Sequence, residues 1–195
     1  MKEFKYTTSF SSVIKALIPE DKDKYLAMAS LVDIGDFIPE VDHEKNIDLT
    51  GVAYKQNNKG ADLFFKEIRE KFIKNQLYKG GNSRLLSESL SQNNVLILLS
   101  DQDAKNKGTI VKFFNINSST HSGAAILSKR NKCPLIYVSI TKINGSYEVK
   151  FDEIKTTNSV EEIVQSYTYK IEKTIIRAPE QYFWFHKRWK SVRKY

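Results

Sequence analysis

The chain has 195 residues, of which 41% are hydrophobic and 12% aromatic, and carries a formal net charge of +8. This length suffices for one domain with a buried core, and the apolar content excludes a disordered chain. The sequence has no apolar run of the roughly 18 residues that a membrane-spanning helix needs, and residues 1–19 are too polar for a secretory signal, so we expect a soluble or peripheral protein.

The positive charge is concentrated at the C-terminal end. Residues 177–195 contain six Lys or Arg and one acidic residue, Glu180. Such a basic patch attracts anionic partners without selecting among them. The one cysteine, Cys133, leaves no internal disulfide, suggests a reducing compartment and has the apolar neighbours of a core residue. Because no repeat or Pro- and Gly-rich linker divides the chain, we predict a single domain over residues 1–195.

The first half of the chain predicts two strands and two helices. Residues 25–31 read as a short buried strand, with a helix as the alternative, and residues 51–54 as a second strand. From Gly60 to Tyr78, apolar residues at helical spacing predict an amphipathic helix. Its inward residues are Ala61, Phe64, Phe65, Ile68 and Phe72. After two glycines, Asn82 caps a second helix. The inward residues of this second helix are Leu85, Leu86 and Leu90.

More strands and a further helix are predicted between residues 94 and 154. Residues 94–100 form a continuous apolar run, which suits a strand covered on both faces. An apolar segment follows at 110–114, and a helix is predicted over residues 122–131. Segments 134–140 and 146–154 flank an Asn-Gly turn, which is typical of a hairpin.

A last helix begins at a capping box. Ser159 and Glu162 have the spacing of that motif, and Pro179 ends the helix because proline cannot continue it. The inner stripe of this helix is Ile163, Tyr167, Ile171 and Ile175.

Helices that alternate with buried strands indicate an α/β domain with a mixed, largely parallel sheet flanked by helices. In this architecture ligands gather beyond the carboxyl ends of the strands. That rule points to the polar residues after 25–31 and to Ser-Asp-Gln-Asp at 100–103. Asp101 could there orient a histidine, accept from a sugar hydroxyl or pair with an arginine. The alternative is a loop aspartate that caps its own turn.

The remaining polar motifs give weaker signals. His43, His121 and His186 lie far apart without the spacing of a zinc site, and no cofactor fingerprint is present, so we expect neither a metal nor a cofactor. Lys79 and Arg84 flank the glycines before the second helix and could hold a phosphate at its N-terminus. A simple C-cap and turn is the alternative.

Residues 181–190, QYFWFHKRWK, combine rings and cations near the end of the chain. So many rings are too apolar to be fully solvated, whereas Lys187, Arg188 and Lys190 cannot be buried without partners. The segment therefore predicts a seam between an apolar side and a charged side. A membrane surface, a nucleic acid or an acylated and phosphorylated ligand would fit it, and a C-terminal element docked on the core is the alternative.

Three further motifs follow one another along the chain: Asp-Gln at 101–102, Phe-Phe at 113–114 and PEQYFWFHKRWK at 179–190. In this order, from about Tyr54 to Lys190, the sequence resembles the C-terminal two thirds of the bacterial lipid A biosynthesis late acyltransferases, of the lysophospholipid acyltransferase superfamily. The resemblance implies a glycerolipid acyltransferase-like fold at the cytoplasmic face of the bacterial inner membrane. It implies transfer of a fatty acyl group from acyl carrier protein to a hydroxyl of an acylated, phosphorylated glucosamine lipid, the lipid A precursor.

The resemblance also implies roles for single residues. Asp101 matches the aspartate at the sheet mouth, and Arg69 matches an arginine on the helix after the second strand, both as substrate-orienting groups. The cationic seam suits a phosphorylated amphiphile, an anionic membrane face and an acidic carrier protein. The expected substrate-binding residues are Arg69, Lys79, His186, Lys187 and Arg188.

The sequence departs from the family pattern at the catalytic base. The family uses a histidine as general base on the acceptor hydroxyl and, after four intervening residues, a carboxylate that fixes the ring. The matching segment, residues 30–39, contains no histidine. Leu31 or Asp33 takes the place of the base, and Asp36 takes that of the acid if Leu31 matches the base.

A second pair has the required spacing. His43 and Asp48 are separated by four residues, but they lie in a charged stretch that reads as a solvated loop, where a base lacks fixed positioning. We therefore keep them as an alternative to Asp36 and Asp101. The sequence lacks the N-terminal membrane helix of the family, so we expect a truncated or degenerate relative.

Three functions follow from the sequence. The leading interpretation is an acyltransferase of the lipid A pathway, and the second is an inactive relative that binds anionic lipid or acyl carrier protein. Nucleic-acid binding is a remote third interpretation, because the basic residues form one tail and no RNA-binding signature accompanies them.

Overall fold

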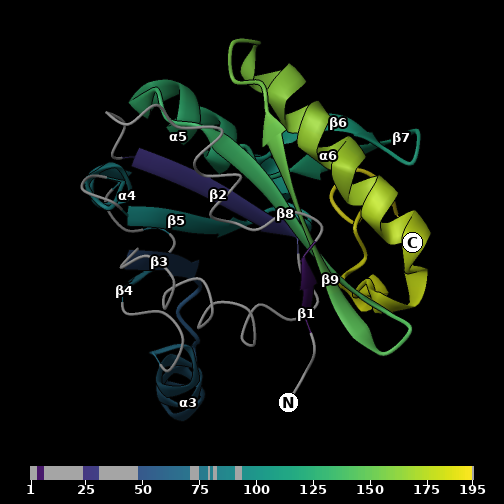
Figure 1. Cartoon of the computed structure of the whole chain (residues 1–195). Helices are drawn as coiled ribbons and strands as arrows, with labels where there is room; N and C mark the ends of the chain where they lie inside the picture. The colour runs from purple at the N-terminus through teal and green to yellow at the C-terminus, as the bar shows by residue number, and fades with distance from the viewer. Residues whose placement is uncertain are drawn as a thin grey trace.

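The computed structural model describes residues 4–6, 24–30, 48–70, 75–78, 80, 83–90 and 94–194. Within these ranges strands and helices are interspersed along the chain, as expected for an α/β domain (Figure 1). The strands are β1 (Phe4–Tyr6), β2 (Lys24–Ser30), β3 (Asp48–Ala53), β4 (Asn75–Tyr78), β5 (Asn94–Leu99), β6 (Thr109–Phe113), β7 (Ile116–Thr120), β8 (Leu135–Ile143) and β9 (Ser146–Ile154). The helices are α3 (Lys59–Glu70), α4 (Ser83–Glu88), α5 (Gly123–Asn131) and α6 (Val160–Arg177), with 3-10 turns η1 (Lys105–Lys107), η2 (Pro179–Gln181) and η3 (Trp184–His186).

One sheet contains seven of the described strands, in the order β1-β9-β8-β2-β5-β3-β4. Strands β8, β2, β5, β3 and β4 run parallel, β9 is antiparallel to β8, and β1 is parallel to β9. The predicted mixed, largely parallel sheet is thus confirmed. The register pairs Ala29 of β2 with both Leu99 of β5 and Val138 of β8. The central parallel strands therefore end at one common edge of the sheet.

Helix α6 forms as its sequence predicts. The Ser159 side chain accepts from the Glu162 N–H at 3.2 Å, and the Glu162 carboxylate accepts from the Ser159 N–H at 2.9 Å, which completes the capping box. The helix ends at Arg177, two residues before Pro179. The predicted inner stripe is buried: Ile163, Tyr167, Ile171 and Ile175. Neither α6 nor any other helix in the described ranges is long and apolar enough to cross a membrane.

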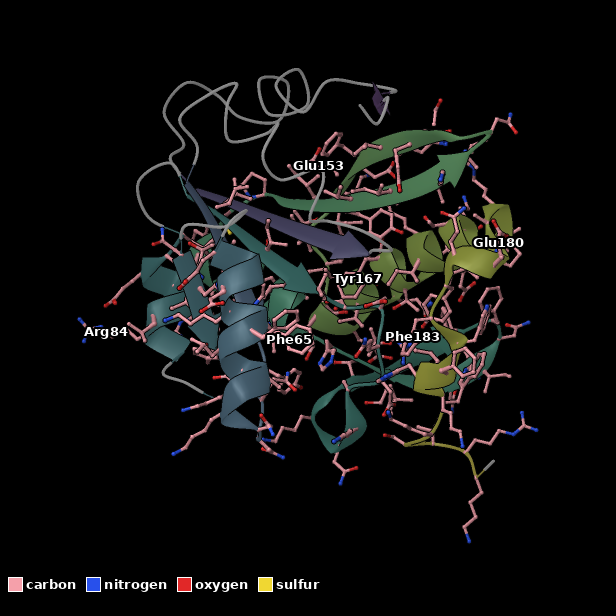
Figure 2. The ribbon with its side chains drawn as sticks, turned by 90° about the horizontal axis from the view of Figure 1, so that it is seen from below. Phe65, Arg84, Glu153, Tyr167, Glu180 and Phe183 are labelled. Carbon is pink, nitrogen blue, oxygen red and sulfur yellow. The ribbon has the colours of Figure 1, made fainter. Side chains whose placement is uncertain are left out.

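The core lies between the sheet, helix α6 and the antiparallel ribbon of β6 and β7. It includes Leu96 and Tyr137 from the sheet, Phe113 from the ribbon and Tyr167 from α6. Figure 2 shows Tyr167 on one face of the sheet and Glu153 of β9 on the other. Because α5 and α6 both pack on the face that carries Tyr167, this face holds the main apolar cluster (Figure 1).

Two local predictions are also confirmed. The turn between β8 and β9 has Asn144 at φ 50° and Gly145 at φ 82°, the positive values that favour Asn-Gly in a tight hairpin. Cys133 is buried in the apolar core beside the start of β8. Both follow from local sequence alone.

The amphipathic helix predicted over residues 60–78 is wrong in its second half. Helix α3 ends at Glu70, and Asn75–Tyr78 is the edge strand β4, which pairs in parallel with β3. A short apolar segment fits the periodicity of a helix as well as that of a strand. Here the strand forms because the edge of β3 offers backbone groups for pairing. The predicted inward positions Phe64 and Phe65 are 57% and 45% exposed, which contradicts that part of the helix prediction.

Two smaller predictions are also corrected. Leu85 of the six-residue helix α4 is 47% exposed, although it was predicted to face inward, whereas Leu90 just after the helix is fully buried as predicted. Strand β5 is not covered on both faces along its whole length. Val95 and Leu96 are buried, whereas Leu99 is 51% exposed because it is the last residue of the strand.

We expect Ser159→Ala to lower the free energy of unfolding by about 1 kcal/mol, because it removes the acceptor for an otherwise unsatisfied helical N–H. Chemical denaturation monitored by circular dichroism measures this change. Thr157→Ala is the matched control, since Thr157 is a nearby hydroxyl residue that lies before the helix. An equal loss in both variants would contradict the capping role.

Candidate active site at the carboxyl edge of the sheet

Asp101 lies where the central strands of the sheet end. It follows β5 directly after Ser100, and both residues are buried, with 9% and 2% of their surface exposed. The end of β2 lies at the same edge, because Ala29 pairs with Leu99. The structure thus confirms the predicted position of this carboxylate, at the edge where α/β proteins bind their ligands.

Burial raises the pKa of the Asp101 carboxyl above its ordinary value, because a charged group loses hydration inside the protein. A hydrogen bond from its own backbone N–H and the positive charge of Arg188 act in the opposite direction. Arg188 is therefore the cation whose charge acts on this carboxyl. A partly desolvated carboxylate in this setting is a strong hydrogen-bond acceptor for a ligand hydroxyl.

Residues 178–194, here called the terminal segment, dock on this edge. The Tyr182 hydroxyl donates to the Asp101 carbonyl at 2.8 Å, and the Asp103 N–H donates to His186 Nε2 at 2.9 Å. The Ser191 hydroxyl donates to an Asp103 carboxylate oxygen. These bonds join two parts of the chain that are more than eighty residues apart, and they fix the loop that carries Asp101.

Arg188 is the centre of this docking. Its side chain is only 2% exposed, and its guanidinium donates to Ser118 Oγ at 2.5 Å, to the Ser119 carbonyl at 2.7 Å and to Thr120 Oγ1 at 2.5 Å. The guanidinium carbon also lies 5.0 Å from the centre of the Phe113 ring, a cation–π contact. A buried guanidinium is tolerated only with such partners, so the arginine holds the terminal segment to the β6/β7 ribbon.

The sequence analysis did not identify β7 as a strand or as a functional element. Its residues Ser118, Ser119 and Thr120 are polar, yet all three are buried around the Arg188 guanidinium. Asp103, which is 5% exposed, lies in the stretch 100–103 to which the sequence pointed, but no role was predicted for it. The one available signal was a run of hydroxyl residues next to an apolar segment, which indicates buried polar partners rather than a loop.

The rings of the terminal segment divide between core and solvent. The Tyr182 and Trp189 rings lie 6.3 and 5.3 Å from Phe113, and the Trp189 indole N–H donates to the Phe113 carbonyl. Phe183, Trp184 and Phe185 instead have exposures of 60%, 43% and 90%. The predicted division into an apolar side of rings and a charged side of cations is therefore only partly correct, because three rings face solvent and Arg188 is buried.

The structure brings together only some of the predicted site residues. Asp101, His186 and Arg188 meet at the carboxyl edge, and Lys187 is exposed next to them. Arg69 lies instead on α3, where its Nε donates to Gln76 Oε1 of β4 at 2.8 Å. Asp36, His43 and Lys79 lie outside the described residues.

The backbone of Asp48 is described, and it begins β3, paired with Asn94 at the start of β5. It therefore lies at the amino edge of the sheet, opposite the edge of Asp101. Within the described ranges, no group of three His, Cys, Asp or Glu side chains could hold a metal ion.

We expect Arg188→Met to lower the free energy of unfolding by roughly 3 kcal/mol, because it leaves the buried β7 hydroxyls without their charged donor. Chemical denaturation measures the loss. Lys187→Met is a matched control, since it removes the same charge from the adjacent exposed position and should change stability by less than about 0.5 kcal/mol. Similar effects of the two substitutions would show that Arg188 does not anchor the segment.

His186 makes this docking sensitive to pH. Because its Nε2 accepts from the Asp103 N–H, the bond requires the neutral ring. Burial lowers the pKa of His186, and Lys190, Arg188 and Lys105 lower it further, whereas Asp103 acts to raise it. A lowered pKa in the folded state makes this contribution to stability complete above the ordinary pKa of 6.5. The contribution is lost as the pH falls through the lowered value.

We therefore expect the wild-type chain to lose more stability than His186→Gln between about pH 7.5 and about pH 5, since glutamine keeps an acceptor but does not titrate. Denaturation at a series of pH values measures the difference. Parallel pH profiles for the two chains would exclude His186 as the titrating group.

Comparison with known proteins assigns this chain to a family. Residues 41–191, which are more than half of the chain, match the family described as bacterial lipid A biosynthesis acyltransferase. The lipid A biosynthesis palmitoleoyltransferase of Escherichia coli (strain K12) and the lipid A biosynthesis acyltransferase of Shigella flexneri are each 30% identical over 116 residues. These matches cover 56% of this chain but only 38% of each relative. The chain belongs to the bacterial lipid A biosynthesis acyltransferase family.

Proposed function

We propose that this chain takes part in lipid A biosynthesis as an acyltransferase with a glycerolipid acyltransferase-like fold. In this proposal it transfers a fatty acyl group from the thioester of acyl carrier protein to a hydroxyl of an acylated, phosphorylated glucosamine lipid. The reaction would take place at the cytoplasmic face of the inner membrane. The observation that carries the proposal is the buried Asp101 carboxylate at the sheet edge, in a chain of this family.

Asp101 suits a role in orienting the acceptor hydroxyl. Its carboxyl is partly desolvated and its backbone is held by Tyr182, so a sugar hydroxyl that donates to it would be bound in a fixed direction. The hydroxyl oxygen would attack the thioester carbonyl, the carbon–sulfur bond would break, and the hydroxyl proton would pass through a base to the leaving thiolate. A carboxyl with a raised pKa is a better proton acceptor than an exposed one, which also supports Asp101 for that step.

The other expected residues fall into two groups in this proposal. Lys187 is exposed beside the edge and suits contact with a substrate phosphate. His186 Nε2 and the two terminal guanidinium nitrogens of Arg188 are engaged within the protein, so these residues would act on substrate by holding the Asp101 loop. We propose Asp36 as a second acid from its place in the family pattern. Arg69, Lys79 and the pair His43 and Asp48 remain proposals from sequence.

A second function is supported by one specific observation. The segment that matches the family's catalytic motif, residues 30–39, contains no histidine. A protein without the general base would retain the acid-lined edge and the exposed cations, and so would bind the lipid A precursor or the acidic carrier protein without acyl transfer. Binding without transfer is therefore the alternative that an activity test must separate.

We expect purified full-length chain, incubated with acyl carrier protein thioester and the glucosamine lipid precursor, to form acylated product detectable by mass spectrometry. Asp101→Asn should lower the rate at least about 100-fold, because the amide is a weaker proton acceptor and donates where the carboxylate accepts. Glu153→Gln is the matched control, since it neutralises a carboxylate on the face of the sheet opposite to Tyr167 (Figure 2).

Precursor binding distinguishes the two functions in the same experiment. If the wild-type chain forms product and Asp101→Asn does not, the result supports the transferase function. Absence of product, together with precursor binding that Asp101→Asn weakens, supports the binding protein instead. If the wild-type chain forms no product and binds neither the precursor nor acyl carrier protein, both functions are excluded.

A further inference from the structure

The outward rings of the terminal segment are unusual because they are exposed yet fixed. Phe183, Trp184 and Phe185 are 60%, 43% and 90% exposed. Their backbone forms the turn η3, closed by bonds from the His186 N–H to the Phe183 carbonyl and from the Lys187 N–H to the Trp184 carbonyl. The Trp184 indole N–H donates to the Pro179 carbonyl at 2.7 Å. The rings are thus presented to solvent by a defined backbone.

These rings cannot turn inward, because other side chains of the same segment already fill the inner positions. Tyr182 and Trp189 pack against Phe113, and Arg188 occupies the space beneath β7. Figure 2 shows Phe183 in the terminal segment, on the side of the sheet opposite to Glu153. Since keeping large rings in water has a cost, three neighbouring exposed rings indicate an apolar partner.

The surroundings of the rings carry a net positive charge. Glu180 is the one acidic residue of the terminal segment, and the cations of this segment that lie outside the core are exposed. These exposed cations are Lys187, Lys190, Arg193 and Lys194. Lys105 of η1 adds a further charge, since it acts on His186 from the neighbouring loop. The partner must therefore combine an apolar region with negative charge.

We infer that Phe183, Trp184 and Phe185, with Lys187, Lys190, Arg193 and Lys194, form a surface that binds the interface of an anionic lipid bilayer. The phenylalanine rings enter the boundary between headgroups and acyl chains, and the cations meet lipid phosphates. The tryptophan takes the headgroup level, which its ring prefers. Phe183 and Phe185 lie 6.0 Å apart at 48° and contact each other, which suits joint insertion better than stacking on separate bases.

This surface adjoins the proposed site. The Trp184 ring lies 4.8 Å from the Tyr182 ring, and the Tyr182 hydroxyl donates to the Asp101 carbonyl. Bilayer contact at the outer rings would therefore hold Asp101 close to the plane of the headgroups. If the proposed function holds, the lipid acceptor is therefore acylated while its acyl chains stay in the bilayer.

Flotation of the full-length chain with vesicles tests the surface without reference to activity. We expect binding to vesicles of phosphatidylethanolamine and phosphatidylglycerol, and much weaker binding to phosphatidylcholine vesicles. Phe185→Ser should lower the partition coefficient about tenfold through the loss of apolar insertion. Arg193→Gln with Lys194→Gln should lower it about fivefold for each charge removed.

Matched controls carry the same chemistry elsewhere on the chain. Tyr169→Ser removes a 53% exposed ring of α6 that lies 4.5 Å from the Lys173 ammonium, and Lys112→Gln with Lys155→Gln removes two exposed charges. These variants should bind vesicles like the wild-type chain. The Phe185→Ser chain should also unfold at the wild-type temperature, because its ring is 90% exposed.

The inference would be overturned if the wild-type chain did not bind anionic vesicles, or if Phe185→Ser left vesicle binding unchanged. It would also be overturned if a single-stranded oligonucleotide displaced the vesicles and Phe185→Ser weakened the binding of that oligonucleotide. Loss of transfer with vesicle binding intact would count against the proposed function alone. Loss of vesicle binding with transfer to detergent-dispersed precursor intact would count against the surface alone.

Discussion

The burial of one guanidinium organises the C-terminal half of this protein. Arg188 lies under β7, bonded to the hydroxyls of Ser118 and Thr120 and stacked on Phe113. A buried cation is costly unless several acceptors surround it, so the segment that carries Arg188 has one favourable position on the ribbon. This requirement determines where the preceding and following residues of the terminal segment lie.

Two consequences follow from this single anchor. On the inner side, Tyr182 and His186 reach the loop after β5 and fix the backbone around Asp101. On the outer side, Phe183 and Phe185 are turned to solvent, since the inner positions are already filled. The same contact thus stabilises the candidate active site and presents the apolar surface beside it, which couples the two in space.

The electrostatics of the edge depend on the same arrangement. Asp101 and Arg188 are both buried, and each loses hydration that the field of the other only partly replaces. Burial thus keeps the Asp101 carboxyl more basic than an exposed aspartate, although the charge of Arg188 lowers its pKa. This raised pKa is the property on which the role proposed for Asp101 rests.

The sequence by itself determined the elements with strong local signals: α6 with its Ser159 capping box, the hairpin at Gly145, and the parallel strands that place Asp101 at an edge. It also determined the family through the order of its motifs. Only the tertiary structure decided that Arg188 is buried while the adjacent Lys187 is exposed, because the acceptors of Arg188 lie about seventy residues earlier in the chain. Strand β4 was likewise decided by the free edge of β3, because pairing between distant segments leaves no local pattern in a short apolar stretch.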